Sequence, residues 1–133
     1  MKYIYLFSVI FFTSSFSLKE KECLAVCASQ IYLKATTEQE FLAAWRQAND
    51  LIARINKGES FETLAKKYSN DPQTQLKGGY MGWFTKKQMQ KSFEKACFNA
   101  KDSMPFQVTT CFGLHVVKVT AKKKISCDKL DYK

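Results

Sequence analysis

The stretches GGYMGWF at residues 78–84 and FGLHVV at residues 112–117 decide the fold of this chain. The glycine pair allows backbone angles that other residues resist, and it directs the chain into a short strand. The second stretch contains a Phe-Gly turn followed by a strand that bears the only histidine, His115. Between the two stretches, Met89 and Phe93 share one face of a predicted helix. The turn, the helix and the last strand can therefore line one small apolar crevice.

The N-terminus has the features of a secretory signal. Lys2 is followed by an almost continuously apolar run over residues 3–12 and then, apart from Phe16, by small polar residues up to Ser17, which predicts cleavage before Leu18. The run is too short to span a bilayer comfortably, which disfavours a retained anchor. The remaining sequence suffices for one compact domain. We predict a signal peptide at 1–17, an N-terminal extension at 18–27, the folded domain at 28–121 and a basic C-terminal tail at 122–133.

Hydrophobic spacing and helix caps predict an α+β domain with the order β-α-α-α-β-α-β-β. The first helix follows the cap Thr37 and ends at Gly58, with an apolar face of Phe41, Trp45, Ala48, Ile52 and Ile55. The other predicted elements are a strand over 24–33, a helix capped by Ser60 and broken at 70–72, a strand over 80–84, a helix opened by a capping box of Thr85 and Gln88, and a hairpin of strands 106–111 and 114–120.

Charge and cysteine content limit the possible partners and the compartment. The formal net charge is +9 at pH 7, and dispersed lysines favour a solvated surface over a site for anionic membranes or nucleic acid. No nucleic-acid-binding motif accompanies the lysines. Five cysteines in a small exported chain indicate disulfides, and the odd number leaves at least one thiol free or bonded to another molecule. The sequence lacks C-x-x-C and has one histidine, so a zinc site is not expected.

Four motifs occur in the order and spacing of one known family. They are FETLAKKYSND at 61–71, GGxxGWF at 78–84, MxxxFxxAxF at 89–98 and TxxGxH at 110–115. Together they resemble the parvulin-type peptidyl-prolyl cis-trans isomerases, over about residues 28–118. The resemblance implies an FKBP-like superfold with a four-stranded antiparallel sheet and about four helices. It also implies isomerisation of X-Pro bonds without a cofactor, a metal or a covalent intermediate.

The resemblance also implies which residues form the site. Met89 and Phe93 would hold the proline ring, with Met81 and Phe112 at the margins of the pocket. These side chains supply adaptable apolar walls without polar atoms that need partners. A Met or Phe stripe on a helix is ordinarily part of a core, however, and the flanking motifs are what favour the pocket.

The polar floor of the family site corresponds to Gln30, Asp71, Thr110 and His115. The first of these positions is commonly histidine in the family, and glutamine retains a donor and an acceptor but lacks the two ring nitrogens. Asp71 either opposes the charge separation of the substrate amide or caps the helical turn after Ser69. His115 is either a satisfied core histidine or an organising residue of the site, and in this family the two roles partly coincide.

Two further expectations follow from the resemblance. If Gln30 lies opposite His115 on antiparallel strands, Cys23 comes near Cys127, which predicts a disulfide between them. The segment 34–38, which carries phosphate-binding basic residues in one branch of the family, has a single lysine here. Selection of phosphorylated substrates is therefore not expected.

The resulting hypothesis is an exported, monomeric isomerase, periplasmic, extracellular or in a secretory lumen, that acts on proline-containing unfolded polypeptides. The alternative is a catalytically weak parvulin-like chaperone or peptide-binding module. Adhesion to anionic surfaces or nucleic acid through the lysines is a third and weaker hypothesis.

Overall fold

The computed structural model describes residues 20–127. The elements are β1 (Glu22–Lys34), α1 (Glu38–Asn56), α2 (Phe61–Tyr68), the 3₁₀ helix η1 (Gln75–Lys77), β2 (Tyr80–Phe84), α3 (Lys91–Asn99), β3 (Phe106–Thr110) and β4 (Gly113–Ser126). This confirms the predicted α+β order, with three α-helices and a 3₁₀ turn as the third helical piece. The predicted signal peptide lies outside the described residues. None of the helices among residues 20–127 has the length and apolar character needed to cross a membrane.

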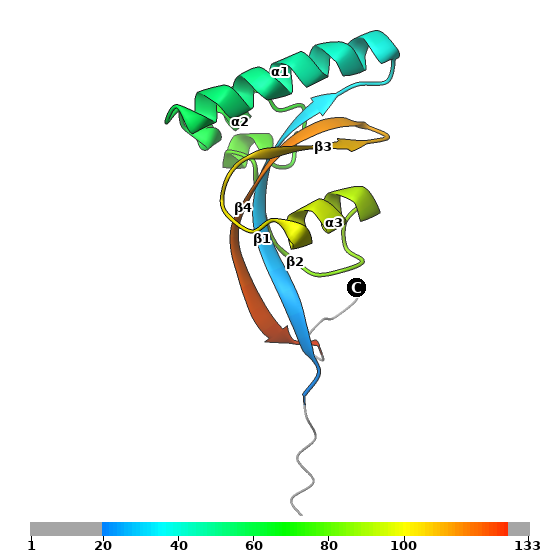
Figure 1. The fold of residues 1–133 in the computed structure, drawn as a ribbon, viewed down its shortest axis with the longest axis vertical. Coiled ribbons are helices and arrows are strands. Elements are labelled where there is room, and N and C mark those ends of the chain that lie inside the picture. Colours follow the sequence, from blue (N-terminus) through cyan, green and yellow to red (C-terminus); the bar gives the residue numbers. More distant parts are fainter. Residues whose placement is uncertain (1–19, 128–133) are drawn as a thin grey trace, which may run out of the picture.

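The strands form one antiparallel sheet in the order β2-β1-β4-β3. The long β1 and β4 strands lie at its centre and extend together away from the helices (Figure 1). Their pairing runs from Lys34 opposite Gly113 to Glu22 opposite Ser126. The sheet therefore includes residues that the sequence assigned to an N-terminal extension and to a C-terminal tail.

The register differs from the expected one by two residues. Tyr32 lies opposite His115, and Gln30 lies opposite Val117. The hairpin fixes this register because Gly113 lies so close to β1 that an added Cβ would be 2.2 Å from the Leu33 carbonyl oxygen. A two-residue offset leaves Gln30 and His115 on the same face of the sheet, as diagonal neighbours.

Helices cover both faces of the sheet. The alternation of side chains along β1 and β4 separates two clusters of buried residues. Ile31, Leu33, Leu114 and Val116 pack with α1 and α2 on one face. The other face packs against α3 through a cluster that contains Val26, Ala28, Phe84, Phe93, Cys97, Val108, Val117 and Val119. The second cluster supports the site described below.

The caps of the first two helices are confirmed. Thr37 and Glu40 form a reciprocal capping box at the start of α1, and the Ser60 hydroxyl accepts a hydrogen bond from the Thr63 amide at the start of α2. The predicted inward position of Trp45 is wrong, because its side chain is 51% exposed. The buried stripe of α1 is centred on Ala44, Ala48 and Leu51 instead.

The helix that was predicted to begin after Thr85 begins later, at Lys91. The Gln88 side chain accepts a hydrogen bond from the Thr85 amide at 2.7 Å, but the Thr85 hydroxyl has no hydrogen-bond partner, so the capping box is incomplete. Lys87 has a φ of 74°, a left-handed conformation that interrupts a helix. Met89 therefore lies in the turn before α3, and Phe93 lies on α3 itself.

A disulfide joins the two ends of the described chain. Cys23 and Cys127 are bonded, with a sequence separation of 104 residues and a Cα–Cα distance of 5.2 Å, which confirms the predicted pairing. A register shift between Cys27 and Ala28 adds one residue to β4, so that Cys23 lies opposite Ile125. The Cys127 amide also donates to the Lys21 carbonyl at 2.8 Å.

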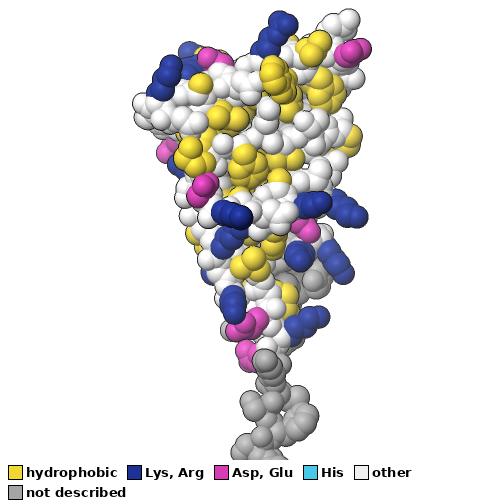
Figure 2. All heavy atoms as spheres, in the orientation of Figure 1, with side chains coloured by type: hydrophobic (Ala, Val, Ile, Leu, Met, Phe, Trp, Pro, Cys, Tyr) yellow, Lys and Arg dark blue, Asp and Glu magenta, His cyan; other side chains and the backbone are white. Residues whose placement is uncertain are grey.

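Basic side chains are spread over the surface. Figure 2 shows Lys and Arg side chains along the whole length of the visible face, with acidic and apolar side chains between them. Four ion pairs connect part of this charge within the described residues, and Arg54 takes part in two of them, with Asp50 and with Glu59. This distribution agrees with a solvated basic surface.

Candidate functional site

A cavity of about 170 Å³ opens between the hairpin, α3 and the middle of the sheet. Seven of the eight residues predicted for the site line it, and Gln90 is an additional lining residue. The lining residues are Gln30, Met81, Met89, Gln90, Phe93, Thr110, Phe112 and His115. The strands β1, β2, β3 and β4, the helix α3 and two turns thus converge on one small volume.

The apolar wall belongs partly to the core and partly to the surface. Phe93 is 4% exposed and packs with Phe84, with a ring centroid distance of 6.2 Å. Its ring also meets the His115 imidazole at 5.5 Å in an edge-to-face arrangement. Phe112, in contrast, is 62% exposed on the hairpin turn. Phe93 is therefore both a core residue and a wall of the cavity, whereas Phe112 is free to contact a ligand.

The polar residues form a continuous chain of hydrogen bonds below the cavity. Thr110 Oγ1 lies 2.9 Å from His115 Nε2, and His115 Nδ1 lies 2.9 Å from Gln30 Oε1. Gln30 Nε2 donates to Asp71 Oδ2 at 3.0 Å. All four predicted polar residues are thereby connected, although Asp71 does not line the cavity itself.

The direction of each hydrogen bond in the series from Thr110 to Asp71 follows from the Asp71 carboxylate. An ionised carboxylate only accepts, so Gln30 donates through Nε2 and must accept through Oε1. His115 Nδ1 therefore carries a proton. In the neutral imidazole, Nε2 is then an acceptor, and the Thr110 hydroxyl donates a hydrogen bond to it. One carboxylate thus selects the imidazole tautomer through the glutamine.

His115 is neutral at physiological pH. Burial lowers the pKa of its imidazole to about 4, against an opposing influence of the Asp71 carboxylate. A neutral ring leaves the cavity without a positive charge at its floor. The arrangement therefore suits a ligand group that has little charge.

Asp71 is held in place by its own turn. Its Oδ1 accepts from the Gln73 amide at 3.0 Å, and its Oδ2 accepts from the Thr74 hydroxyl at 2.6 Å as well as from Gln30. The preceding segment is bound to β1, because the Asn70 amide donates to the Tyr32 carbonyl at 2.7 Å. Asp71 therefore stabilises the turn and orients Gln30 at the same time.

The sequence reasoning missed two residues of the site. Tyr32 stacks on His115 with a centroid distance of 4.9 Å and an interplanar angle of 25°. Gln90 lines the cavity and donates to Cys111 Sγ at 3.3 Å. Tyr32 follows Gln30 by two residues on a strand and shares its face of the sheet, a spacing that identifies it once Gln30 is assigned.

The three free cysteines of the described chain differ in accessibility. Cys27 and Cys97 are buried, and Cys111 is exposed on the hairpin turn. Burial raises the pKa of the Cys97 thiol to about 12, which leaves it protonated and unreactive. No group of three or more His, Cys, Asp or Glu side chains that could hold a metal ion occurs within residues 20–127.

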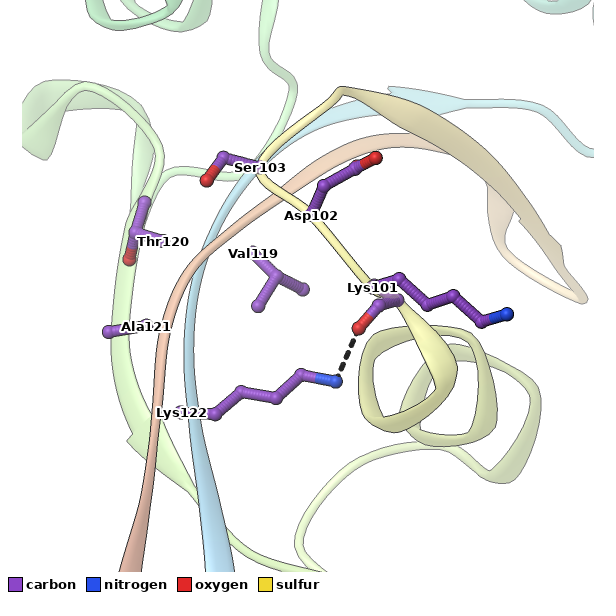
Figure 3. A pocket seen from close by; sticks show the side chains of 8 residues that line it. Lys101, Asp102, Ser103, Val119, Thr120, Ala121 and Lys122 are labelled. Carbon is purple, nitrogen blue, oxygen red and sulfur yellow. Dashed lines mark hydrogen bonds between the residues drawn. The ribbon is translucent and has the colours of Figure 1, made fainter.

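A second cavity, of about 250 Å³, lies between β4 and the segment that follows α3 (Figure 3). Lys122 reaches across it and donates to the carbonyls of Phe98 and Ala100, at 2.8 and 2.5 Å. The ammonium group thus stabilises the C-terminal end of α3. None of the predicted site residues lines this cavity.

Comparison with known proteins agrees with this site. The model of the PPIC-type PPIase domain matches residues 14–123. The foldase protein PrsA of Geobacillus kaustophilus is 41% identical over 80 residues, which are 59% of this chain and 28% of the relative. This chain thus spans less than a third of the length of that curated relative.

Solved structures show the same likeness. The peptidyl-prolyl isomerase PrsA from Bacillus anthracis superposes with a TM-score of 0.65 and 29% identity, covering 76% of this chain and 43% of that one. NmPin, the parvulin of Nitrosopumilus maritimus, superposes with a TM-score of 0.60 and 28% identity, covering 73% of this chain and 96% of that one. The chain therefore belongs to the family of PPIC-type peptidyl-prolyl cis-trans isomerase domains, the parvulins that its motifs resemble.

Proposed function

We propose that the chain is an exported peptidyl-prolyl cis-trans isomerase that accelerates X-Pro isomerisation in folding polypeptides. The observation that carries the proposal is the apolar cavity with a neutral, hydrogen-bonded histidine at its floor. An engineered apolar cavity of about 150 Å³ takes up benzene, so the cavity of about 170 Å³ has room for a pyrrolidine ring. Its lining includes residues from three of the four motifs, those at 78–84, 89–98 and 110–115.

The apolar wall fits the chemistry of the reaction. Amide resonance gives the C–N bond partial double-bond character, with a rotation barrier of about 18 to 20 kcal/mol. The twisted amide has less charge separation than the planar one, so removal of water by Met81, Met89 and Phe93 favours the twisted state relative to the ground state. Each tenfold acceleration requires about 1.4 kcal/mol of such preference. No bond to the enzyme is formed.

The polar residues have an organising role in this proposal. His115 and Thr110 present a fixed pattern of donors and acceptors next to the proline ring, and Gln30 transmits the orientation set by Asp71. Because these groups are already bonded to one another, they need no reorganisation when the amide twists. The residues thus hold the geometry of the pocket and transfer no proton.

The proposed substrates and compartment rest on independent features. The similar protein from Geobacillus kaustophilus is named a foldase, which supports unfolded, proline-containing polypeptides as substrates. The Cys23–Cys127 disulfide and the signal-like N-terminus support export to a periplasm, an extracellular space or a secretory lumen. We further propose that the domain acts as a monomer.

The test is an isomerisation assay on short Xaa-Pro peptides, in which NMR exchange spectroscopy measures the rate of isomerisation. Phe112→Ala removes a wall residue that is exposed, so it should lower kcat/KM at least about tenfold while the fold remains intact. Leu42→Ala is the matched control, because Leu42 is a similarly exposed apolar residue on α1, at 55%. Equal turnover by both variants, or no turnover above background by the native chain, would contradict the proposal.

One observation favours a second candidate, a peptide-binding module or chaperone with little turnover. The position that is commonly histidine in the family is Gln30, so the floor of the cavity contains one imidazole. The same peptides separate the two functions. Binding that depends on Phe112 but is not accompanied by isomerisation would support the module.

A further inference from the structure

Tyr32 connects the imidazole of the site to the margin of the cavity. Its ring stacks on His115 at 4.9 Å, and its hydroxyl donates to the Phe112 carbonyl at 2.8 Å. The Tyr32 backbone is itself fixed on the side of β1 away from β4, where its amide donates to Ser69 Oγ at 3.1 Å and its carbonyl accepts from the Asn70 amide at 2.7 Å. The side chain therefore projects from a well-anchored residue.

The stacked ring restricts the imidazole of His115. The hydrogen bonds to Gln30 and Thr110 hold the two ring nitrogens, and they restrict tilting of the ring about the line between these atoms less than its other motions. A ring at an interplanar angle of 25° opposes that motion and excludes water from one face of the imidazole. The contact of Phe93 with His115 is edge-to-face and thus restricts the ring in a different way.

The hydroxyl of Tyr32 restricts the hairpin turn. Phe112 is attached to the domain through backbone hydrogen bonds, from Ala35 N to its carbonyl at 3.2 Å and from its own amide to Thr110 Oγ1 at 3.3 Å. The Tyr32 hydroxyl adds a third attachment at the same carbonyl, at 2.8 Å. This bond sets the position of an exposed aromatic side chain at the mouth of the cavity.

We infer that Tyr32 is a positioning residue of the proposed isomerase: its ring holds His115 in place, and its hydroxyl holds the Phe112 margin of the cavity. The inference rests on the proposed function and assigns a role to a residue outside the four family motifs. Tyr32 contributes one of the restraints on the imidazole of His115. This is the single imidazole of the site, because the position that is commonly histidine in the family is Gln30 here.

The charged and titratable groups around the pair are few. The charge of Asp71 raises the pKa of both His115 and Tyr32, and Cys111 raises the pKa of Tyr32 alone. Burial, followed by these two groups, raises the pKa of the Tyr32 hydroxyl. The hydroxyl thus stays protonated and able to donate over the pH range of the assay.

The experiment compares Tyr32→Phe, Tyr32→Leu and the control Tyr68→Leu by NMR titration and by kinetics. His115 is the only histidine, so its ring signals need no assignment by mutation. Tyr32→Leu should raise the pKa of His115 toward 6.5 and lower kcat about twofold to tenfold, the range expected from loss of one aromatic pair. Tyr32→Phe should keep the histidine pKa and kcat but raise KM.

The outcomes distinguish positioning from general stability. Tyr68 is half-buried on α2 and packs against the cluster on the other face of the sheet, so its loss should leave the pKa of His115 and kcat unchanged. If Tyr32→Leu does not fold, Tyr32→Met removes the ring but retains a longer, more adaptable side chain of similar volume to leucine. An unchanged histidine pKa in both ring-less variants would overturn the inference. A native chain without turnover would instead refute the proposed function, while the titration would still report on Tyr32.

Discussion

Removal of the Cys23–Cys127 disulfide should destabilise the domain strongly. The bond closes a loop with a sequence separation of 104 residues, for which the chain-entropy model gives about 4.7 kcal/mol at 25 °C. Backbone hydrogen bonds pair the ends of β1 and β4 and join the Cys127 amide to the Lys21 carbonyl, and we expect these bonds to persist in the reduced protein. The loss therefore arises mainly from the greater freedom of the unfolded chain. We expect the free energy of unfolding to fall by about 3 to 5 kcal/mol in Cys23→Ser/Cys127→Ser.

The assay is urea unfolding with and without a reducing agent, monitored through the fluorescence of Trp45 and Trp83. Reduction should lower the unfolding midpoint of the native chain and leave the double variant unchanged. Cys111→Ser is the control, because Cys111 is exposed and free. Equal midpoints for the oxidised native chain and the double variant, or a comparable loss in Cys111→Ser, would refute the reasoning.

The expected loss is large on the scale of such a domain. Typical domains have a free energy of unfolding of about 5 to 15 kcal/mol, so a decrease of this size brings a small domain close to its unfolding transition. Neither cysteine lines the cavity, and isomerase activity should therefore survive reduction at temperatures where the domain stays folded. The disulfide therefore contributes to the stability of the domain and not to the cavity.

Three further predictions concern the site. Because burial lowers the pKa of His115 from 6.5 in the unfolded chain to about 4, the unfolded state binds the extra proton between these values. In urea titrations, the contribution of His115 to the free energy of unfolding should therefore be constant above pH 6.5 and should decrease toward pH 4. The decrease should be less than about 3 kcal/mol, because the ring is partly exposed. Gly79→Ala should destabilise the domain by more than about 1 kcal/mol, because the added Cβ would lie 2.3 Å from the Gln30 carbonyl oxygen. Gly58→Ala is the control in urea unfolding, because its Cβ would meet no atom and would add only backbone strain. Thr110→Val should cost about 1 to 3 kcal/mol in the same assay and reduce turnover, because His115 Nε2 loses its donor, while Thr109→Val on the exposed side of the same strand should do neither.

Local signals in the sequence were sufficient for most of the fold. Thr37 and Ser60 could be identified as caps because a hydroxyl before an apolar periodic run has few other uses. The capping pattern at Thr85 failed because half of it was satisfied without a helix, as the Gln88 side chain bonds the Thr85 amide in a turn. The left-handed conformation of Lys87 could not be foreseen, because lysine has no preference for it.

The strand register required information that a sequence pattern does not contain. The family resemblance placed Gln30 and His115 together, and they share a face in any register that differs by two residues from that expectation. The choice among those registers depends on how closely the hairpin approaches β1, and Gly113 sets that distance through contact with the Leu33 carbonyl. Tyr32 could be placed on the face of Gln30 from its spacing, but only the true register places it directly opposite His115.

The glutamine at position 30 is compatible with an organised site because of what its neighbours require. Asp71 needs a donor, and the Nδ1–H of His115 needs an acceptor, so the residue between them must offer one of each on two different atoms. A primary amide meets this requirement with Nε2 and Oε1, and a neutral imidazole would meet it with its two ring nitrogens. The substitution therefore preserves the direction of every hydrogen bond from Thr110 to Asp71. What it removes is an aromatic ring from the floor of the cavity, and the stacking of Tyr32 on His115 keeps the remaining imidazole restrained.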